Sequence, residues 1–218
     1  MQTKPSVSFD NTQVAFQDKS NRELLLAYLI FLLTKNPVLV KWLSRSAKLC
    51  LDLGLPIKRI IKSTVFKQFC GGESSREYRR VIDTLGRATI GTILDYSVEG
   101  SQDEAGFENT TAELLKVIEE AAGDPNIPCS CMKLSAIGDV ALFEAVSAGQ
   151  TLTSAQIDAW ERIGARLDTI CAAAKRSQKP IYIDAEESWI QGAVDEIAWE
   201  MSRQYNKKVP TVINAVQL

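Results

Sequence analysis

The segment PIYIDAEES, residues 180–188, places an apolar run directly before a cluster of carboxylates. Its β-branched and aromatic residues at 181–183 favour a strand. Asp184, Glu186 and Glu187 then crowd the following turn, where like charges repel and burial is costly. A solvated turn that opens the next helix is one interpretation, since acids favour helix N-termini, and it suits Glu187 best. Asp184 requires another explanation.

Three further segments resemble this strand: TILDYS (92–97), CSCMKLS (129–135) and PTVINAV (210–216). Helices are predicted between them, the first entered at Thr110 and closed at Gly123, the others over 139–147, 154–177 and 188–206. Strands that alternate with helices of this length predict a parallel sheet with right-handed crossovers.

The first part of the chain is predicted to be helical. One of its helices begins with an S/T-x-x-E/Q capping box at Ser20, and two more such boxes, at Thr110 and Thr153, begin helices in the second part. The apolar run LLLAYLIFLL (24–33) is too short to span a bilayer, which needs ~20 residues. We expect it to be buried, because it is apolar on most sides. A membrane-surface role is less favoured, since its flanks lack a basic face.

Composition excludes several classes of function. The net charge of -2 gives no basic excess for nucleic acid. Five cysteines without CxxC spacing, and no secretory signal, indicate reduced thiols and a cytoplasmic protein. The chain has no histidine, which excludes Ser-His-Asp and Cys-His catalysis and most zinc hydrolase sites, so no metal site is expected.

Two parallel folds compete. A doubly wound nucleotide-binding fold would carry a glycine-rich turn after its first strand, but SVEGSQDEAGFENTT (97–111) holds neither GxGxxG nor GxxxxGK. A (β/α)8 barrel fits better, because its active sites gather residues from the carboxyl ends of several strands. We therefore predict an α/β fold: a partial, TIM-like (β/α)8 barrel with about four parallel strands over 88–218, preceded by an N-terminal helical arm over 1–87.

Polar side chains stand at the carboxyl end of each predicted strand. Alternation along a strand turns Lys133 and Asp184 to one face, opposite Met132 and Ile183. Acids and a lysine at one barrel rim are costly unless they pair or bind something. The alternative is an ion-pair cluster that closes the barrel top. The candidate site residues are Asp95, Glu99, Lys133, Asp184, Glu186, Asn214 and Gln217.

Five segments in order over residues 60–218 resemble the proline dehydrogenase family, most closely its single-function bacterial enzymes. They are FKQFCGGES (66–74), GTILDYSVEG (91–100), CMKLSAIG (131–138), IYIDAEES (181–188) with WEMSRQYN (199–206), and TVINAVQL (211–218). The resemblance implies a flavoenzyme on a distorted (β/α)8 barrel, which oxidises L-proline to Δ1-pyrroline-5-carboxylate with FAD. Electrons then pass to a quinone or another acceptor, which implies peripheral contact with the inner face of the membrane.

The resemblance also assigns roles. Lys133 matches the lysine that pairs with the proline carboxylate, and Asp184 the aspartate beneath flavin and substrate. Asp95 and Glu99 match the substrate-side acids after the first strand. Glu186 neighbours Asp184 in the DAE motif. Asn214 or Gln217 stands where the family places an amide against the flavin, although NAVQ replaces the usual QAY pattern.

A barrel of this type takes ~250 residues, and the sequence stops at its fourth predicted strand. We therefore interpret the chain as the N-terminal half of such an enzyme, without the later strands and arginines, and expect the isolated fragment to be inactive. Two alternatives stay open. One is a Schiff-base lyase with Lys133 as the nucleophile; the other is a non-catalytic half-barrel.

Overall fold

The computed structural model describes residues 9–96 and 103–217, apart from the side chain of Ser75. It divides into two units, residues 1–78 and 79–218, and each is described here by itself. The predicted domain limits, 1–87 and 88–218, stay a prediction.

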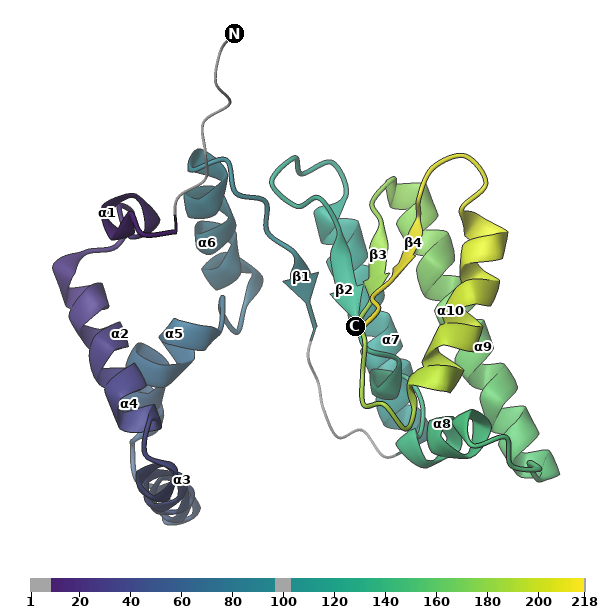
Figure 1. The fold of residues 1–218 in the computed structure, drawn as a ribbon, viewed down its shortest axis with the longest axis horizontal. Helices are drawn as coiled ribbons and strands as arrows, with labels where there is room; N and C mark the ends of the chain where they lie inside the picture. The colour runs from purple at the N-terminus through teal and green to yellow at the C-terminus, as the bar shows by residue number, and fades with distance from the viewer. Residues whose placement is uncertain (1–8, 97–102, 218) are drawn as a thin grey trace, which may run out of the picture. The chain divides into compact units, whose positions relative to one another are not determined.

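The second unit contains a sheet of four parallel strands in the order β1-β2-β3-β4 (Figure 1). Each strand lies beside the next one in the chain, and helices fill the connections between β1 and β4, as the alternating pattern predicted. The strands are β1 (Leu94–Asp95), β2 (Ser130–Met132), β3 (Ile181–Ile183) and β4 (Val212–Asn214).

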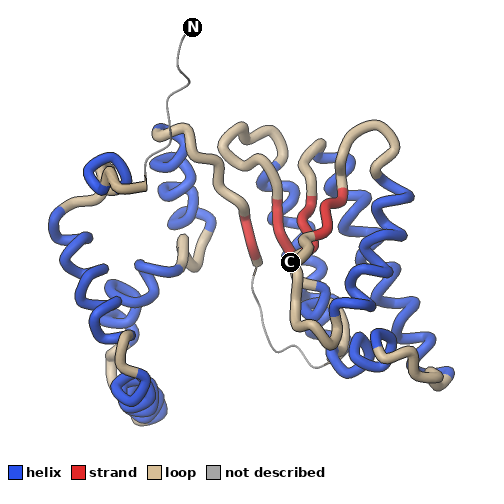
Figure 2. Tube along the Cα trace, in the orientation of Figure 1, coloured by secondary structure: helices blue, strands red, loops and turns tan. Residues whose placement is uncertain are grey.

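Helices cover one face of this sheet, as Figures 1 and 2 show. Side chains of the strands alternate accordingly: Met132, Ile181 and Ile183 are buried, whereas Cys131 and Tyr182 are half-buried on the other face. The covering helices are α7 (Glu104–Ala121), α9 (Ser154–Ser177) and α10 (Gln191–Tyr205), and α8 (Val140–Ser147) packs against α10. The core between the sheet and the helices includes Leu114, Ile118, Met132, Leu167, Ile170, Ile181, Ile183, Val194, Ile197 and Val212.

The start of α7 differs from the sequence prediction. The helix begins at Glu104, where the side chain of Asp103 accepts a hydrogen bond from the Gly106 N–H at 2.8 Å. The predicted capping box at Thr110 is therefore wrong. Thr110 and Thr111 lie inside the helix and are buried, and the Thr111 hydroxyl donates to the carbonyl of Phe107 at 2.9 Å. A threonine can bond the preceding turn of a helix, so the same sequence pattern fits a helix interior.

The other two capping boxes are confirmed. The Ser20 hydroxyl accepts from the Glu23 N–H and opens α2, and Thr153 pairs with Gln156 in the same way at the start of α9. The helices before the sheet are α1 (Thr12–Ala15), α2 (Asn21–Thr34), α3 (Pro37–Asp52), α4 (Lys58–Ile61), the π-helix η1 (Lys62–Phe66), α5 (Lys67–Phe69) and α6 (Ser75–Arg87).

The expected burial of the LLLAYLIFLL helix is wrong for this structure. Ile30 is buried, but Leu25 and Tyr28 are 59% and 64% exposed. The reason is the small number of neighbours, since an apolar helix stays exposed wherever no second element packs on it. None of the described helices is long and apolar enough by itself to cross a bilayer, and α2 with α3 meet the length and composition criteria only as a pair bent by 106°.

Candidate functional site

The candidate site lies at the carboxyl ends of the strands, on the face that no described helix of the second unit covers. Lys133 and Asp184 follow β2 and β3 directly, and both are half-buried. Asp95 ends β1 and is exposed, in register with Cys131 of β2. Because parallel strands end at one edge of the sheet, residues from three separate segments meet there.

The pKa of the Cys131 thiol reflects the burial and the charge of this face. Burial, together with the smaller effect of the negative charges of Asp95 and Asp184, raises the pKa of this thiol to about 11. The strand register agrees, because Asp95 is the partner of Cys131 on β1, and Asp184 follows Tyr182, its partner on β3, by two residues. The face between the strands is acidic and only partly solvated, a setting in which a bound cation or ammonium group gains strong electrostatic attraction.

Asp184 is held by local hydrogen bonds. Its backbone N–H donates to the carbonyl of Met132 at 2.9 Å, which continues the β2–β3 ladder by one residue. Its Oδ1 accepts from the N–H of Ala185 at 3.0 Å. The carboxylate is thus fixed at the end of the strand rather than used as a helix cap, because α10 begins only at Gln191.

Glu186 connects the loops after two neighbouring strands. It is 8% exposed, and its Oε1 accepts from the backbone N–H of Ser135 at 3.0 Å. Its own N–H donates to the side chain of Gln191 at 2.8 Å. A charged hydrogen bond of this kind orders both loops, so Glu186 supports the positions of Lys133 and Asp184.

Asn214 lies on the side of β4 that faces α10. It is in register with the buried Ile183, and its amide donates to Oδ1 of Asp195 at 2.7 Å. Its Oδ1 is buried and accepts no hydrogen bond within the described residues. Gln217, which is exposed, donates to the carbonyl of Glu186 at 3.5 Å and so lies at the rim of the site.

Two residues that support the site were missed from the sequence. Gln191 bonds Glu186 with its oxygen and Asp195 with its nitrogen, the latter at 2.8 Å. Asp195 thus receives bonds from both α10 and β4. The spacing of four residues between Gln191 and Asp195 was the available signal, since such pairs adjoin on one helix face.

Of the other acids predicted for this region, Glu99 lies outside the described residues. Glu187 is exposed, and its backbone carbonyl accepts hydrogen bonds from the N–H groups of Ile190 and Gln191. Among the residues that the structure describes, no group of three or more His, Cys, Asp or Glu could hold a metal ion.

Four adjacent parallel strands with helices on one face form part of a TIM-like (β/α)8 barrel. The proline utilization A protein (PutA) of Bdellovibrio bacteriovorus has a similar fold, with a TM-score of 0.56 at 15% identity over 69% of this chain and 17% of that one. The model of the proline dehydrogenase family matches residues 78–218. The chain therefore belongs to the proline dehydrogenase family.

Two relatives illustrate the range of the family. The carbapenem antibiotics biosynthesis protein CarD of Pectobacterium carotovorum is 31% identical over 155 residues, 71% of this chain and 41% of that protein. Proline dehydrogenase 1, mitochondrial, of Dictyostelium discoideum is 26% identical over 249 residues, 95% of this chain and 43% of that protein. The chain spans less than half the length of these two relatives.

Proposed function

We propose that this chain forms the proline-binding part of an FAD-dependent enzyme that oxidises L-proline to Δ1-pyrroline-5-carboxylate. The observation that carries the proposal is the meeting of Lys133 and Asp184 at the carboxyl ends of neighbouring parallel strands, in a chain of this family. The names of the relatives support the same activity, which is proposed here for the whole enzyme.

The substrate is a zwitterion, and the charges of the site suit it. The ammonium group of Lys133 would pair with the carboxylate of proline. Asp95, Asp184 and Glu99 would surround its amine with negative charge. Each charge on the substrate thus meets an opposite one, which offsets the cost of removing it from water.

The residues present also fit a flavin. A flavin ring needs hydrogen-bond donors along its edge and a cation near the position of negative charge after reduction, and the rim offers Gln217 and Lys133 for these tasks. When bound, FAD supplies the acceptor for the hydride that leaves C5 of proline. Asp184 would hold the ring and substrate in place, and Glu186 would act through the loop that it orders.

Of the two amides proposed for flavin contact, Gln217 is the better candidate. Asn214 is engaged with Asp195 on the helix-facing side of the sheet, whereas Gln217 lies at the rim. The enzyme is further proposed to work in the cytoplasm and to pass electrons to a quinone or another acceptor at the inner face of the membrane, with peripheral contact.

The test uses the protein expressed from its complete gene and purified with excess FAD. It measures whether this protein catalyses the reduction of an artificial dye by L-proline. We expect flavin absorbance and dye reduction with L-proline, and much less with D-proline as the matched control. Absence of flavin, together with covalent trapping of Lys133 by borohydride and a carbonyl substrate, would instead support a Schiff-base lyase.

A further inference from the structure

The charge of this chain is strongly divided, although its total is only -2. Residues 79–218 carry 13 basic and 21 acidic side chains, a net charge of -8. Residues 35–69 carry eight basic side chains and one acidic residue, Asp52, a net charge of +7. A positive segment of this size on a negative protein is a candidate site for an anionic partner. The eight are Lys35, Lys41, Arg45, Lys48, Lys58, Arg59, Lys62 and Lys67.

Helix α3 combines this charge with an exposed apolar stripe. Val38, Trp42 and Leu49 are 64%, 66% and 59% exposed. Their spacing of four and seven residues places them on one side of the helix. The other side, which includes Val40 and Ala47, is half-buried.

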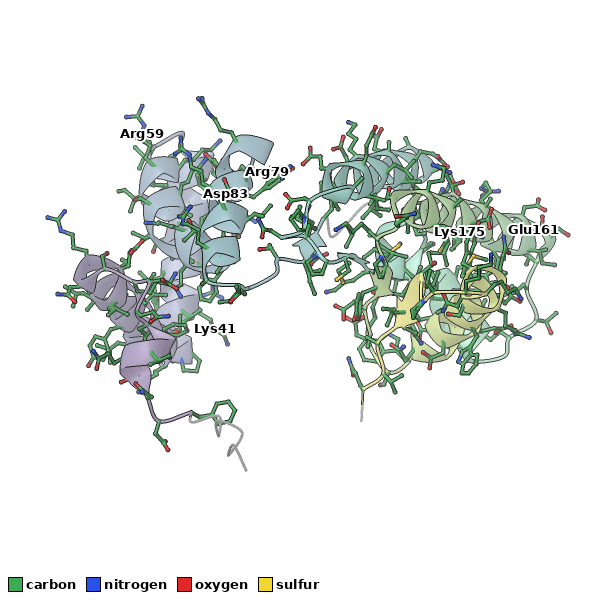
Figure 3. All side chains as sticks on the ribbon, turned by 90° about the horizontal axis from the view of Figure 1, so that it is seen from above. Lys41, Arg59, Arg79, Asp83, Glu161 and Lys175 are labelled. Carbon is green, nitrogen blue, oxygen red and sulfur yellow. The ribbon has the colours of Figure 1, made fainter. Side chains whose placement is uncertain are left out.

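Basic residues lie alongside this stripe. Lys41, Arg45 and Lys48 are exposed, and none of them forms an ion pair with another described residue. At 100° per residue the three fall on the arc of the helix next to Val38 and Leu49. On α4 of the same unit, Arg59 also points away from the helices, as Figure 3 shows. The cations are therefore free to meet an external anionic surface.

We propose that α3 binds the surface of a lipid bilayer that contains anionic lipids, with Val38, Trp42 and Leu49 inserted at the headgroup level. A helix with an apolar stripe bordered by lysine and arginine lies in such an interface, and tryptophan favours that depth. The cations attract the anionic headgroups, each contributing about a fivefold gain in affinity.

Charge disfavours a second copy of the chain at this stripe, and the apolar side chains disfavour nucleic acid. A second copy would bring another segment of charge +7 against the first. Nucleic acid would match the charge but leave the apolar stripe in water. The inference deepens the proposed membrane contact and rests on the proposed function for its biological role, yet it is measured without proline or flavin.

The experiment is flotation of the 218-residue chain on a density gradient with vesicles of phosphatidylcholine, with and without phosphatidylserine, because self-associated protein without lipid does not float. We expect binding to the anionic vesicles that weakens as salt is added, and little binding to the neutral ones. The triple variant K41Q/R45Q/K48Q should bind about a hundredfold more weakly. Trp42→Ser should also weaken binding. Trp199→Ser is the matched control, because Trp199 of α10 is 64% exposed outside the basic segment, and its loss should leave binding unchanged.

Circular dichroism checks that each variant keeps its helices. Equal binding to neutral and anionic vesicles, no binding to either, or unchanged binding by the triple variant would each overturn the proposal. So would a lipid-free dimer that Trp42→Ser dissociates, since this result would assign the stripe to a second copy. If the protein did not oxidise proline but still bound anionic vesicles, the proposed function would be wrong and the membrane proposal would stand. The two proposals can therefore be distinguished.

Discussion

Lys133 is the residue on which the proposed proline site depends most. Replacing Lys133 with alanine leaves the substrate carboxylate without its cation, and losing one partner of such a pair costs about 2–5 kcal/mol. We therefore expect the KM for L-proline to rise more than about tenfold, with the FAD content of the purified enzyme unchanged.

The matched control is Lys179→Ala. This lysine lies before β3, at the opposite end of the sheet, and donates to the carbonyls of Asp124 and Ile127 at 2.7 and 2.6 Å. Its loss should lower the free energy of unfolding but leave the KM alone. An unchanged KM in Lys133→Ala would contradict the role of Lys133.

Asp184 and Glu187 separate a site residue from a turn residue within one short segment. Asp184→Ala should lower kcat without unfolding the enzyme, because the half-buried carboxylate faces the site and, among the described residues, its one hydrogen bond is the local one to Ala185. Glu187→Ala should change little, because that side chain is exposed. Steady-state kinetics and thermal melts of both variants provide the measurement. A normal kcat in Asp184→Ala would show that this aspartate has no role in the site and only forms part of the turn before α10.

Cys131 offers a chemical probe of the same face. Because burial and the nearby aspartates raise its pKa to about 11, the thiol predominates at every pH below that value. Only about one molecule in a thousand carries the reactive thiolate at pH 8. We expect iodoacetamide to modify Cys131 at least about tenfold more slowly than the exposed Cys70, at a rate that rises with pH up to about 11. Mass spectrometry of the labelled peptides measures both rates, and rapid labelling of Cys131 at pH 8 would show that this face is open and not acidic.

At the scale of elements, one buried arginine contributes strongly to the contact between α7 and α9. Arg166 is 5% exposed, and its guanidinium donates to Glu108 at 2.7 Å, to the carbonyl of Ile137 at 3.0 Å and to Glu104. It also lies 5.6 Å from the centroid of the Phe107 ring. One side chain thus joins two helices and the loop after β2.

Arg166→Ala should destabilise the fold by about 2–3 kcal/mol, because it leaves a buried carbonyl without its donor. Arg162→Ala is the matched control one turn earlier in α9. Arg162 donates to the same Glu104 at 2.8 Å, but it is 48% exposed, so water screens the pair and its loss should cost much less than the loss of Arg166. Urea titrations give both free energies of unfolding. Equal losses of unfolding free energy in the two variants would mean that the burial of Arg166 does not increase its contribution to stability.

At the scale of the whole molecule, the described sheet is open. Strands β1 and β4 each have a single neighbour, and no described helix of the second unit covers the face with Cys131, Tyr182 and Ile213. Such edges and faces invite pairing with other chains.

The 218-residue chain alone should therefore neither bind FAD tightly nor oxidise proline, and it should self-associate through the sheet. Size-exclusion chromatography, flavin absorbance and dye reduction by L-proline check this prediction together. A yellow monomer that reduces dye with proline would contradict it, and would mean that four strands carry a complete site.

Local sequence was enough to predict the parallel sheet and most element boundaries. The helix over 154–177 agrees with α9 residue for residue, because the Thr153–Gln156 box fixes its start and no later tertiary contact overrides it. Alternation over residues 130–135 and 180–184 likewise separated buried from half-buried residues correctly, since the side-chain period of a strand is two, whereas Cys129, on the face of Cys131, is buried. Lys133 and Asp184 emerged from this pattern, whereas their assignment to proline came from resemblance.

Only the tertiary structure decided the features that depend on distant partners. Thr110 matches a capping box in sequence, but the cap that forms is Asp103, because buried packing favours a longer α7. Asn214 and Gln217 look equivalent in sequence, and contact with Asp195 separates them. The apolar α2 looks like a core helix and is exposed, since burial requires a neighbour that a local pattern cannot supply. Periodicity determines which face of an element is apolar, and only the assembled fold determines what that face meets.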